Sequence, residues 1–129
     1  MTKTDKIPLI PIFSFSQKNF SPIQRILYPY YDALYVPINA YELESPPLQY
    51  PSLHKPEIVL VDLISLWEGS TKAINYIRQI LPHSNQILIH QYQSVDLQLE
   101  LHNPFVVAQY RPDELASELV PCLSKLFVL

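Results

Sequence analysis

The chain has almost no glycine: Gly69 is the only one among 129 residues, against 13 prolines. Loops that hold a phosphate or a dinucleotide use glycine so that the backbone can come close to the ligand. Neither a GxGxxG nor a GxxxxGK[ST] segment is present. Nucleotide binding through those motifs is therefore excluded, and no cofactor is expected.

Cysteine and long hydrophobic runs are also scarce. The single cysteine, Cys122, excludes an internal disulfide, and the histidines share no spacing typical of a metal site, so no metal is expected. No apolar run reaches the ~18 residues that a membrane span needs. The N-terminus lacks an apolar signal region followed by a cleavage site. We therefore expect a cytoplasmic protein with no membrane contact.

Basic charge is not concentrated anywhere in the chain. Nine Lys and Arg against 12 Asp and Glu give a net charge of -3, with no basic stripe, so nucleic-acid binding is not expected. A length of 129 residues with 48% hydrophobic content indicates one globular domain. We expect that domain to span residues 1–129, with residues 1–6 frayed and no output domain attached.

The clearest pattern that is present lies in residues 57–81, EIVLVDLISLWEGSTKAINYIRQIL. A short apolar run rich in β-branched residues ends at Asp62 and predicts a buried strand. After Gly69 the apolar residues fall at helical intervals until Pro82 stops the pattern. A buried strand followed by a loop and an amphipathic helix is the unit of a parallel α/β sheet, where ligand chemistry lies at the carboxyl ends of the strands.

The same alternation extends over the rest of the chain. Strands are predicted over residues 9–15, 34–38, 58–62, 86–91 and 105–108. Helices are predicted from Ser21-Pro22, over residues 41–44, from residue 70, over part of 93–103, and from residue 112. Right-handed crossovers make this a five-stranded parallel sheet with helices on both faces. The proline-rich connection over residues 39–56 is the part where regular structure is least determined.

Residues 93–103 carry two conflicting signals. Val95, Leu97, Leu99 and Leu101 alternate with polar residues, which is the period of a half-buried strand. The position in a βα repeat favours a short helix, and we predict that helix; an irregular segment or a hairpin strand is the competing interpretation.

The order of elements, together with LHKPEIVLVDL, a glycine seven residues after the aspartate, and NYIRQILPHSNQILIHQ, resembles the receiver domain of bacterial two-component response regulators. The resemblance implies a flavodoxin-like receiver fold, with Asp62 at the position of the phosphoacceptor. It spans nearly the whole chain and is strongest over residues 53–91.

The resemblance also shows what is missing from the phosphorylation site. Receivers hold Mg²⁺ with an acidic pair at the end of the first strand, where this chain has Ser14-Phe15-Ser16. His90 stands at the place of the phosphate-binding hydroxyl, and two sequence landmarks put Ala108 at the place of the lysine that ends the fifth strand. These departures predict a degenerate pseudo-receiver with no metal ion and no catalysis.

Asp62 and His90 allow other interpretations as well. The carboxylate of Asp62 could simply be satisfied by nearby backbone N–H groups. His90 is expected to face Asp62 across the same edge of the sheet, where a His–Asp pair could make a pH-dependent contact. A hydrolase triad of Ser14 or Ser16 with His90 and Asp62 lacks the GxSxG segment that would support it.

Aromatic residues supply candidates for an interaction surface, because tyrosine and tryptophan are enriched at protein interfaces. Tyr92, Phe105 and Tyr110 lie by the last two strands, and Trp67 follows Asp62 in the next loop. In receivers the surface of the fourth helix, fifth strand and fifth helix is the usual contact face.

The leading hypothesis is therefore a non-catalytic pseudo-receiver that acts as a protein–protein interaction or adaptor module in signalling. Its partner would be another protein, and a homodimer is one option. The first alternative is an atypical receiver phosphorylated on Asp62. The second is a small-ligand or enzymatic domain of flavodoxin-like fold, with a ligand at the Ser14–Asp62–His90 edge.

Overall fold

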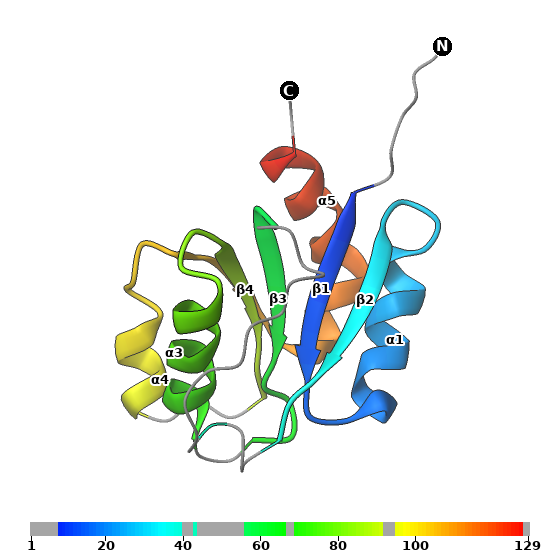
Figure 1. The fold of residues 1–129 in the computed structure, drawn as a ribbon. Helices are drawn as coiled ribbons and strands as arrows, with labels where there is room; N and C mark the ends of the chain where they lie inside the picture. The colour runs from blue at the N-terminus through cyan, green and yellow to red at the C-terminus, as the bar shows by residue number, and fades with distance from the viewer. Residues whose placement is uncertain (1–7, 40–42, 44–55, 67–68, 92–94, 128–129) are drawn as a thin grey trace.

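The fold is a single parallel sheet with helices on both faces (Figure 1). The computed structural model describes residues 8–39, 43, 56–66, 69–91 and 95–127. The sheet has the order β2-β1-β3-β4-β5, and every neighbouring pair is parallel. The strands are β1 (Leu9–Ser14), β2 (Asp32–Pro37), β3 (Ile58–Asp62), β4 (Asn85–Ile89) and β5 (Val106–Tyr110). This confirms the predicted α/β class, and the strand order is that of flavodoxin-like folds.

The helices divide between the two faces of the sheet (Figure 1). They are α1 (Gln17–Leu27), α3 (Ser70–Ile80), α4 (Val95–Glu100), the 3-10 turn η2 (Pro112–Glu114) and α5 (Leu115–Leu126). One core cluster joins α3 and α4 to their face of the sheet, and a second joins α1 and α5 to the other face. Buried strands with apolar residues on both faces are what this two-sided packing requires.

The central unit follows the sequence pattern closely. All five residues of β3 are buried, and the loop after it carries Gly69 with a φ of 88° at the N-cap of α3. A residue with a side chain is strained at that φ, so the only glycine of the chain stands where the backbone needs one. Helix α3 ends two residues before Pro82, as predicted.

The conflict over residues 93–103 is resolved in favour of a short helix, α4. The three alternating leucines show why the period of two is misleading here: Leu97 is fully buried, Leu99 is 67% exposed, and Leu101 lies beyond the helix end. In a helix, residues two apart point in different directions, so the alternating leucines cannot share one face.

The predicted start of the first helix was wrong. Helix α1 begins at Gln17, and the N-cap is Ser16, whose Oγ accepts the Asn19 N–H. Ser21 and Pro22 lie inside the helix, where Ser21 donates to the Gln17 carbonyl and Pro22 is exposed. Pro22 stands on the solvent side, so the buried face of the helix remains intact.

Two further predictions lie mostly outside the described residues. The short helix predicted over residues 41–44 has only Leu43 among them, and the connection over 39–56 is described only at its ends.

None of the described helices combines the length and apolar character that crossing a bilayer requires.

Candidate functional site

The strand order places the candidate site between β1 and β3. The order reverses there, and ligands of open α/β sheets bind outside the carboxyl ends of the strands at such a point. In the ladder Ser14 lies opposite Asp62, and both are the last residues of their strands. The topology therefore brings together two of the predicted site residues that lie 48 positions apart in the chain.

This point of the sheet is closed to solvent. Ser14 is 0% exposed and Asp62 is 1% exposed. Ser14 Oγ lies 2.6 Å from Asp62 Oδ2, and the Ile64 N–H donates to Asp62 Oδ1 over 3.0 Å. Burial raises the pKa of Asp62 above its ordinary value, while the hydrogen bonds to Ser14 and Ile64 lower it. The carboxyl group is satisfied by the protein itself and offers no free oxygen to a ligand.

His90 does not face Asp62, and that prediction was wrong. Asp62 lies opposite Ile89 in the ladder, so His90 is one residue further along. Successive side chains of a strand point to opposite faces of a sheet. Ile89 packs in the cluster with α1 and α5, so His90 turns to the other face, where its Nε2 lies 2.6 Å from Gln109 Oε1.

Ala108 does not stand at the end of the fifth strand. It lies opposite Ile87 in the ladder, whereas Tyr110 lies opposite Ile89, next to the row of Ser14 and Asp62. The register shifts between Gln86 and Ile87, which leaves Val107 as an extra residue in β5. Counting from sequence landmarks could not detect this bulge, so Ala108 was placed two residues too far along.

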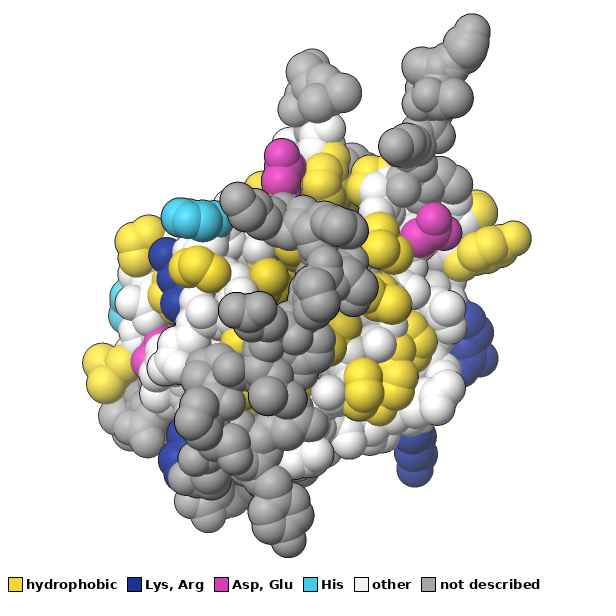
Figure 2. Space-filling model, in the orientation of Figure 1, with side chains coloured by type: hydrophobic (Ala, Val, Ile, Leu, Met, Phe, Trp, Pro, Cys, Tyr) yellow, Lys and Arg dark blue, Asp and Glu magenta, His cyan; other side chains and the backbone are white. Residues whose placement is uncertain are grey.

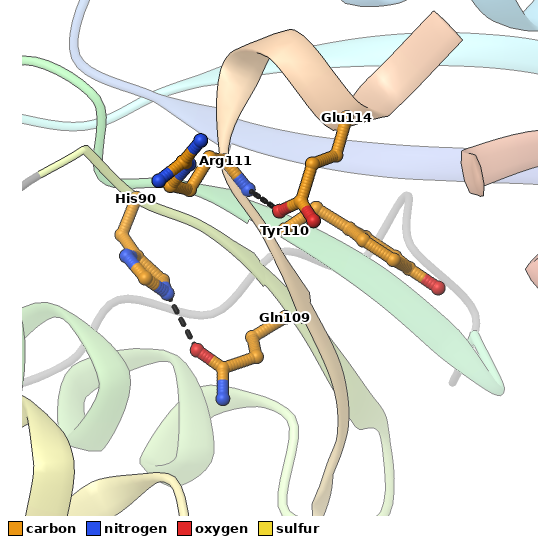
Figure 3. Close-up of a pocket in the computed structure, with 5 residues that line it drawn as sticks. All are labelled: His90, Gln109, Tyr110, Arg111 and Glu114. Atoms are coloured by element: carbon orange, nitrogen blue, oxygen red, sulfur yellow. Dashed lines mark hydrogen bonds between the residues drawn. The ribbon is translucent and has the colours of Figure 1, made fainter. Parts of the chain in front are cut away.

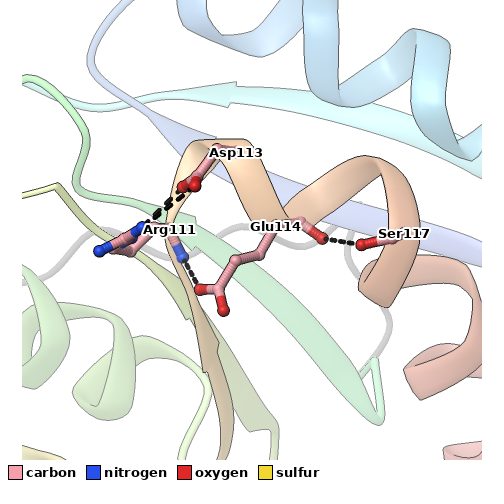
Figure 4. Close-up of polar contacts among 4 residues, drawn as sticks. All are labelled: Arg111, Asp113, Glu114 and Ser117. Carbon is pink, nitrogen blue, oxygen red and sulfur yellow. Dashed lines mark hydrogen bonds and ion pairs between the residues drawn. The ribbon is translucent and has the colours of Figure 1, made fainter.

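Arg111 takes the position that follows β5. The His90 N–H donates to the Tyr110 carbonyl, so the ladder continues up to Arg111. Its guanidinium pairs with Asp113 over 3.0 Å, and its backbone N–H donates to Glu114 Oε1 (Figure 4). The hydrogen bond from Arg111 lowers the pKa of Asp113 below its usual range. The Arg111 guanidinium thus forms its ion pair within the turn that follows β5, and it is exposed to solvent.

An open cavity of about 450 Å³ lies beside these residues (Figure 3). It is lined by His90, Gln109, Tyr110, Arg111 and Glu114. His90 Nδ1 is buried and has no hydrogen-bond partner among the described residues. Burial raises the pKa of the Tyr110 hydroxyl, with smaller effects from Cys122, Glu118 and Glu114. In the part of the chain that the structure describes, no group of three or more His, Cys, Asp or Glu could hold a metal ion.

Two of the aromatic candidates for an interaction surface, Phe105 and Tyr110, are not among the large exposed side chains. Phe105 is half-buried with the Arg78 guanidinium 4.4 Å from its ring centre, and Tyr110 packs against the cluster of α1 and α5. Trp67 and Tyr92 lie outside the described residues. Among the described residues the large exposed hydrophobic side chains are Leu9, Tyr28, Tyr30, Leu99, Val107 and Leu126.

Four of these side chains belong to one end of the molecule, which we call the tyrosine end: Leu9, Tyr28, Tyr30 and Leu126. Strand β1 begins and helix α5 ends there, beside the connection from α1 to β2 (Figure 1). The Asp32 N–H donates to the Pro8 carbonyl, and the rings of Tyr31 and Phe127 lie 5.8 Å apart, which links the three segments. Figure 2 shows hydrophobic side chains at this end and over β2. Nothing in the sequence distinguishes these exposed tyrosines from the others in the chain.

No protein-family model matches the chain, and no curated protein matches it. Solved structures do. One is a CheY-like response regulator receiver domain protein from Methanospirillum hungatei JF-1, with 15% identity, a TM-score of 0.68, and 94% of each chain covered. Another is a response regulator from Thermotoga maritima, with 17% identity and a TM-score of 0.67, covering 94% of this chain and 98% of that chain.

A third is the signal receiver domain of an HD domain-containing protein from Pseudomonas fluorescens Pf-5, with 15% identity and a TM-score of 0.67, covering 93% of this chain and 94% of that chain. These likenesses show that the chain has the receiver fold over nearly its whole length. The resemblance stated from the sequence is confirmed at the level of the fold.

Proposed function

We propose that this protein is a non-catalytic pseudo-receiver that serves in signalling by binding another protein. The observation that carries this proposal is the closed contact between Ser14 and Asp62. In receivers the same place holds the acidic pair and the Mg²⁺ ion that neutralise phosphoryl charge. Here a hydroxyl fills it, so phosphoryl transfer lacks a stabilising effect worth several kcal/mol in metal-assisted reactions.

The binding surface that the exposed side chains favour is the tyrosine end. Tyr28 is 74% exposed and Tyr30 is 61% exposed, and neither is used in either core cluster. Large aromatic side chains with a polar tip are typical anchors of protein interfaces. The face of α4, β5 and α5, with Leu99 and Val107 exposed, is the competing surface.

The first alternative is a receiver that is phosphorylated on Asp62. It draws support from Arg111, which follows β5 and could meet a phosphoryl group in place of a lysine. The second alternative, a small-ligand domain, draws support from the cavity beside His90. We favour the interaction module because Arg111 already pairs with Asp113 and Asp62 is closed to ligands.

An NMR titration with Mg²⁺ and then beryllofluoride, a mimic of the phosphoryl group, separates the leading proposal from phosphorylation. We expect no chemical-shift change at Ser14, Asp62 or Ile64, because their polar atoms already bond to one another. Asp62→Asn is the control: a shift that persists in this variant arises elsewhere. Shifts at Asp62 that spread to α4 and α5 in the wild type and vanish in the variant would establish the phosphorylation switch instead.

Affinity capture from the source lysate tests the binding surface. We expect the Tyr28→Glu/Tyr30→Glu variant to lose a protein that the wild type retains, because a buried interface does not accept two unpaired carboxylates. Leu99→Glu is the matched control and should retain that protein. If only Leu99→Glu fails to retain the captured protein, the interface lies at α4 instead. If the wild type captures no specific protein and does not self-associate, the adaptor proposal fails.

A further inference from the structure

Ser14 Oγ lies within hydrogen-bond distance of three polar atoms. It is 2.6 Å from Asp62 Oδ2 and 2.8 Å from the backbone oxygen of Ser16, and the Ser16 N–H donates to it over 3.2 Å. A hydroxyl carries one proton and can therefore donate one hydrogen bond, while its oxygen can accept two. If Asp62 were ionised, two acceptor oxygens would compete for the single proton of Ser14.

A protonated Asp62 resolves this competition. The carboxylic acid donates from Oδ2 to Ser14 Oγ, Ser14 donates to the Ser16 carbonyl, and the Ser16 N–H donates back to Ser14 Oγ. Asp62 Oδ1 then acts as the carbonyl oxygen of the acid and accepts the Ile64 N–H. Each contact now has one donor and one acceptor, as buried polar groups require.

The surroundings of Asp62 favour the neutral acid. The side chain is 1% exposed, and taking an ionised carboxylate out of water is costly unless a cation compensates it. The charged and titratable groups at the Asp62 end of the neighbouring described elements are Lys18, Lys72, His90, Tyr110, Arg111, Asp113 and Glu114. None of these is among the causes of the pKa shift of Asp62: burial raises the pKa, and the bonds to Ser14 and Ile64 lower it by less than burial raises it.

The start of α1 acts in the opposite direction, because a helix N-terminus attracts an anion. Two of its N–H groups, however, point at Ser16 and not at Asp62: Asn19 donates to Ser16 Oγ and to the Ser16 carbonyl, and Phe20 donates to the same carbonyl. Ser16 therefore joins the proton chain of Asp62 to the N-cap of α1.

We propose that Asp62 keeps its proton at neutral pH, and that this proton couples the β1–β3 edge of the sheet to the start of α1. Ionisation of Asp62 would draw the Ser14 proton to Oδ2 and take it away from the Ser16 carbonyl. The hydrogen bond from Ser14 to the carbonyl of Ser16, the N-cap residue of α1, would then be lost. A neutral acid is also a poor nucleophile. The proposal is independent of the interaction function proposed above and does not require a partner protein.

The proposal predicts how stability changes with pH. Below the ordinary pKa of 3.8, Asp62 is protonated in both the folded and the unfolded chain. Above that value the unfolded chain releases its proton while the folded chain keeps it, so the folding equilibrium constant falls about tenfold for each pH unit. The fall continues until the pH passes the raised pKa of the folded state.

Urea unfolding of the wild type and of Asp62→Asn over this pH range measures that effect. In the variant the side-chain amide donates to Ser14 Oγ and its oxygen accepts the Ile64 N–H, so the hydrogen bonds remain without a titrating group. We expect the two proteins to differ little near the ordinary pKa of aspartate and the variant to become the more stable one as the pH rises. Asp32→Asn, at an exposed aspartate that begins β2, is the matched control and should follow the wild type.

Infrared spectroscopy provides a readout that does not depend on stability. The wild type at neutral pH should show the carbonyl band of one protonated carboxyl group, and Asp62→Asn should lack it. The proposal is overturned if this band is absent, or if Asp62→Asn becomes less stable relative to the wild type as the pH rises. Either result would mean that Asp62 is ionised in the fold, and the interaction function proposed above would still stand.

Discussion

Phe13→Ala is expected to lower the free energy of unfolding by about 3–5 kcal/mol. Phe13 lies in the middle of the sheet, is 0% exposed, and packs in the cluster under α3 and α4. Removing the ring leaves a cavity that the neighbouring strands cannot close, because both sides of β1 are held in ladders. Urea denaturation followed by circular dichroism measures the loss.

Phe15→Ala is the matched control for this prediction. Phe15 carries the same side chain two residues further on, but it lies past the end of β1 and is only half-buried. Its loss should cost clearly less, because part of the ring already contacts water. If both variants lost the same free energy of unfolding, Phe15 would contribute to the core as much as Phe13 does, and the prediction would be wrong.

Ser14→Asp/Phe15→Asp is expected to turn the closed edge into a site that depends on a metal ion. Ser14 lies opposite Asp62 and Phe15 is the next residue, so the double variant adds two carboxyl groups at the edge of the sheet that holds the buried Asp62. Without a cation the uncompensated buried charge should cost on the order of 3–5 kcal/mol of folding free energy. Mg²⁺ prefers carboxylate oxygens and should restore much of that loss.

Thermal unfolding in chelator and in millimolar Mg²⁺ measures this rescue. The wild type should unfold at the same temperature in both buffers, whereas the double variant should gain stability with Mg²⁺. Adding Asp62→Asn to the double variant removes one ligand and should weaken the rescue. A double variant that is stable without metal would contradict the expectation that carboxylates at positions 14 and 15 make this edge depend on a metal ion.

The site was only partly predictable from the sequence. The position of Asp62 followed from the buried run before it, and its closeness to Ser14 followed from the strand order that a βα repeat imposes. The position of His90 did not follow, because one residue of register reverses the face to which a side chain points. Arg111 was missed, since nothing in the sequence marks the extra residue at Val107.

The exposed tyrosines show the same limit. The chain has nine tyrosines. Tyr110 and Tyr28 look alike in the sequence, and the fold packs the first against α5 and leaves the second 74% exposed. Which aromatic residue can meet a partner depends on the helix that covers it, and that is a long-range contact.

By itself, the sequence determined the α/β class, the order of the described strands and helices, the buried central strand and the absence of a carboxylate from Ser14, Phe15 and Ser16. These are local properties, because periodicity and residue type along one segment are enough to give them. Only the tertiary structure decided that Asp62 is closed by Ser14, that His90 turns to Gln109, and that the exposed side chains gather at the tyrosine end. The first two depend on register between strands distant in the chain, where a shift of one residue would reverse the face of a side chain. The third depends on which side chains the helices cover.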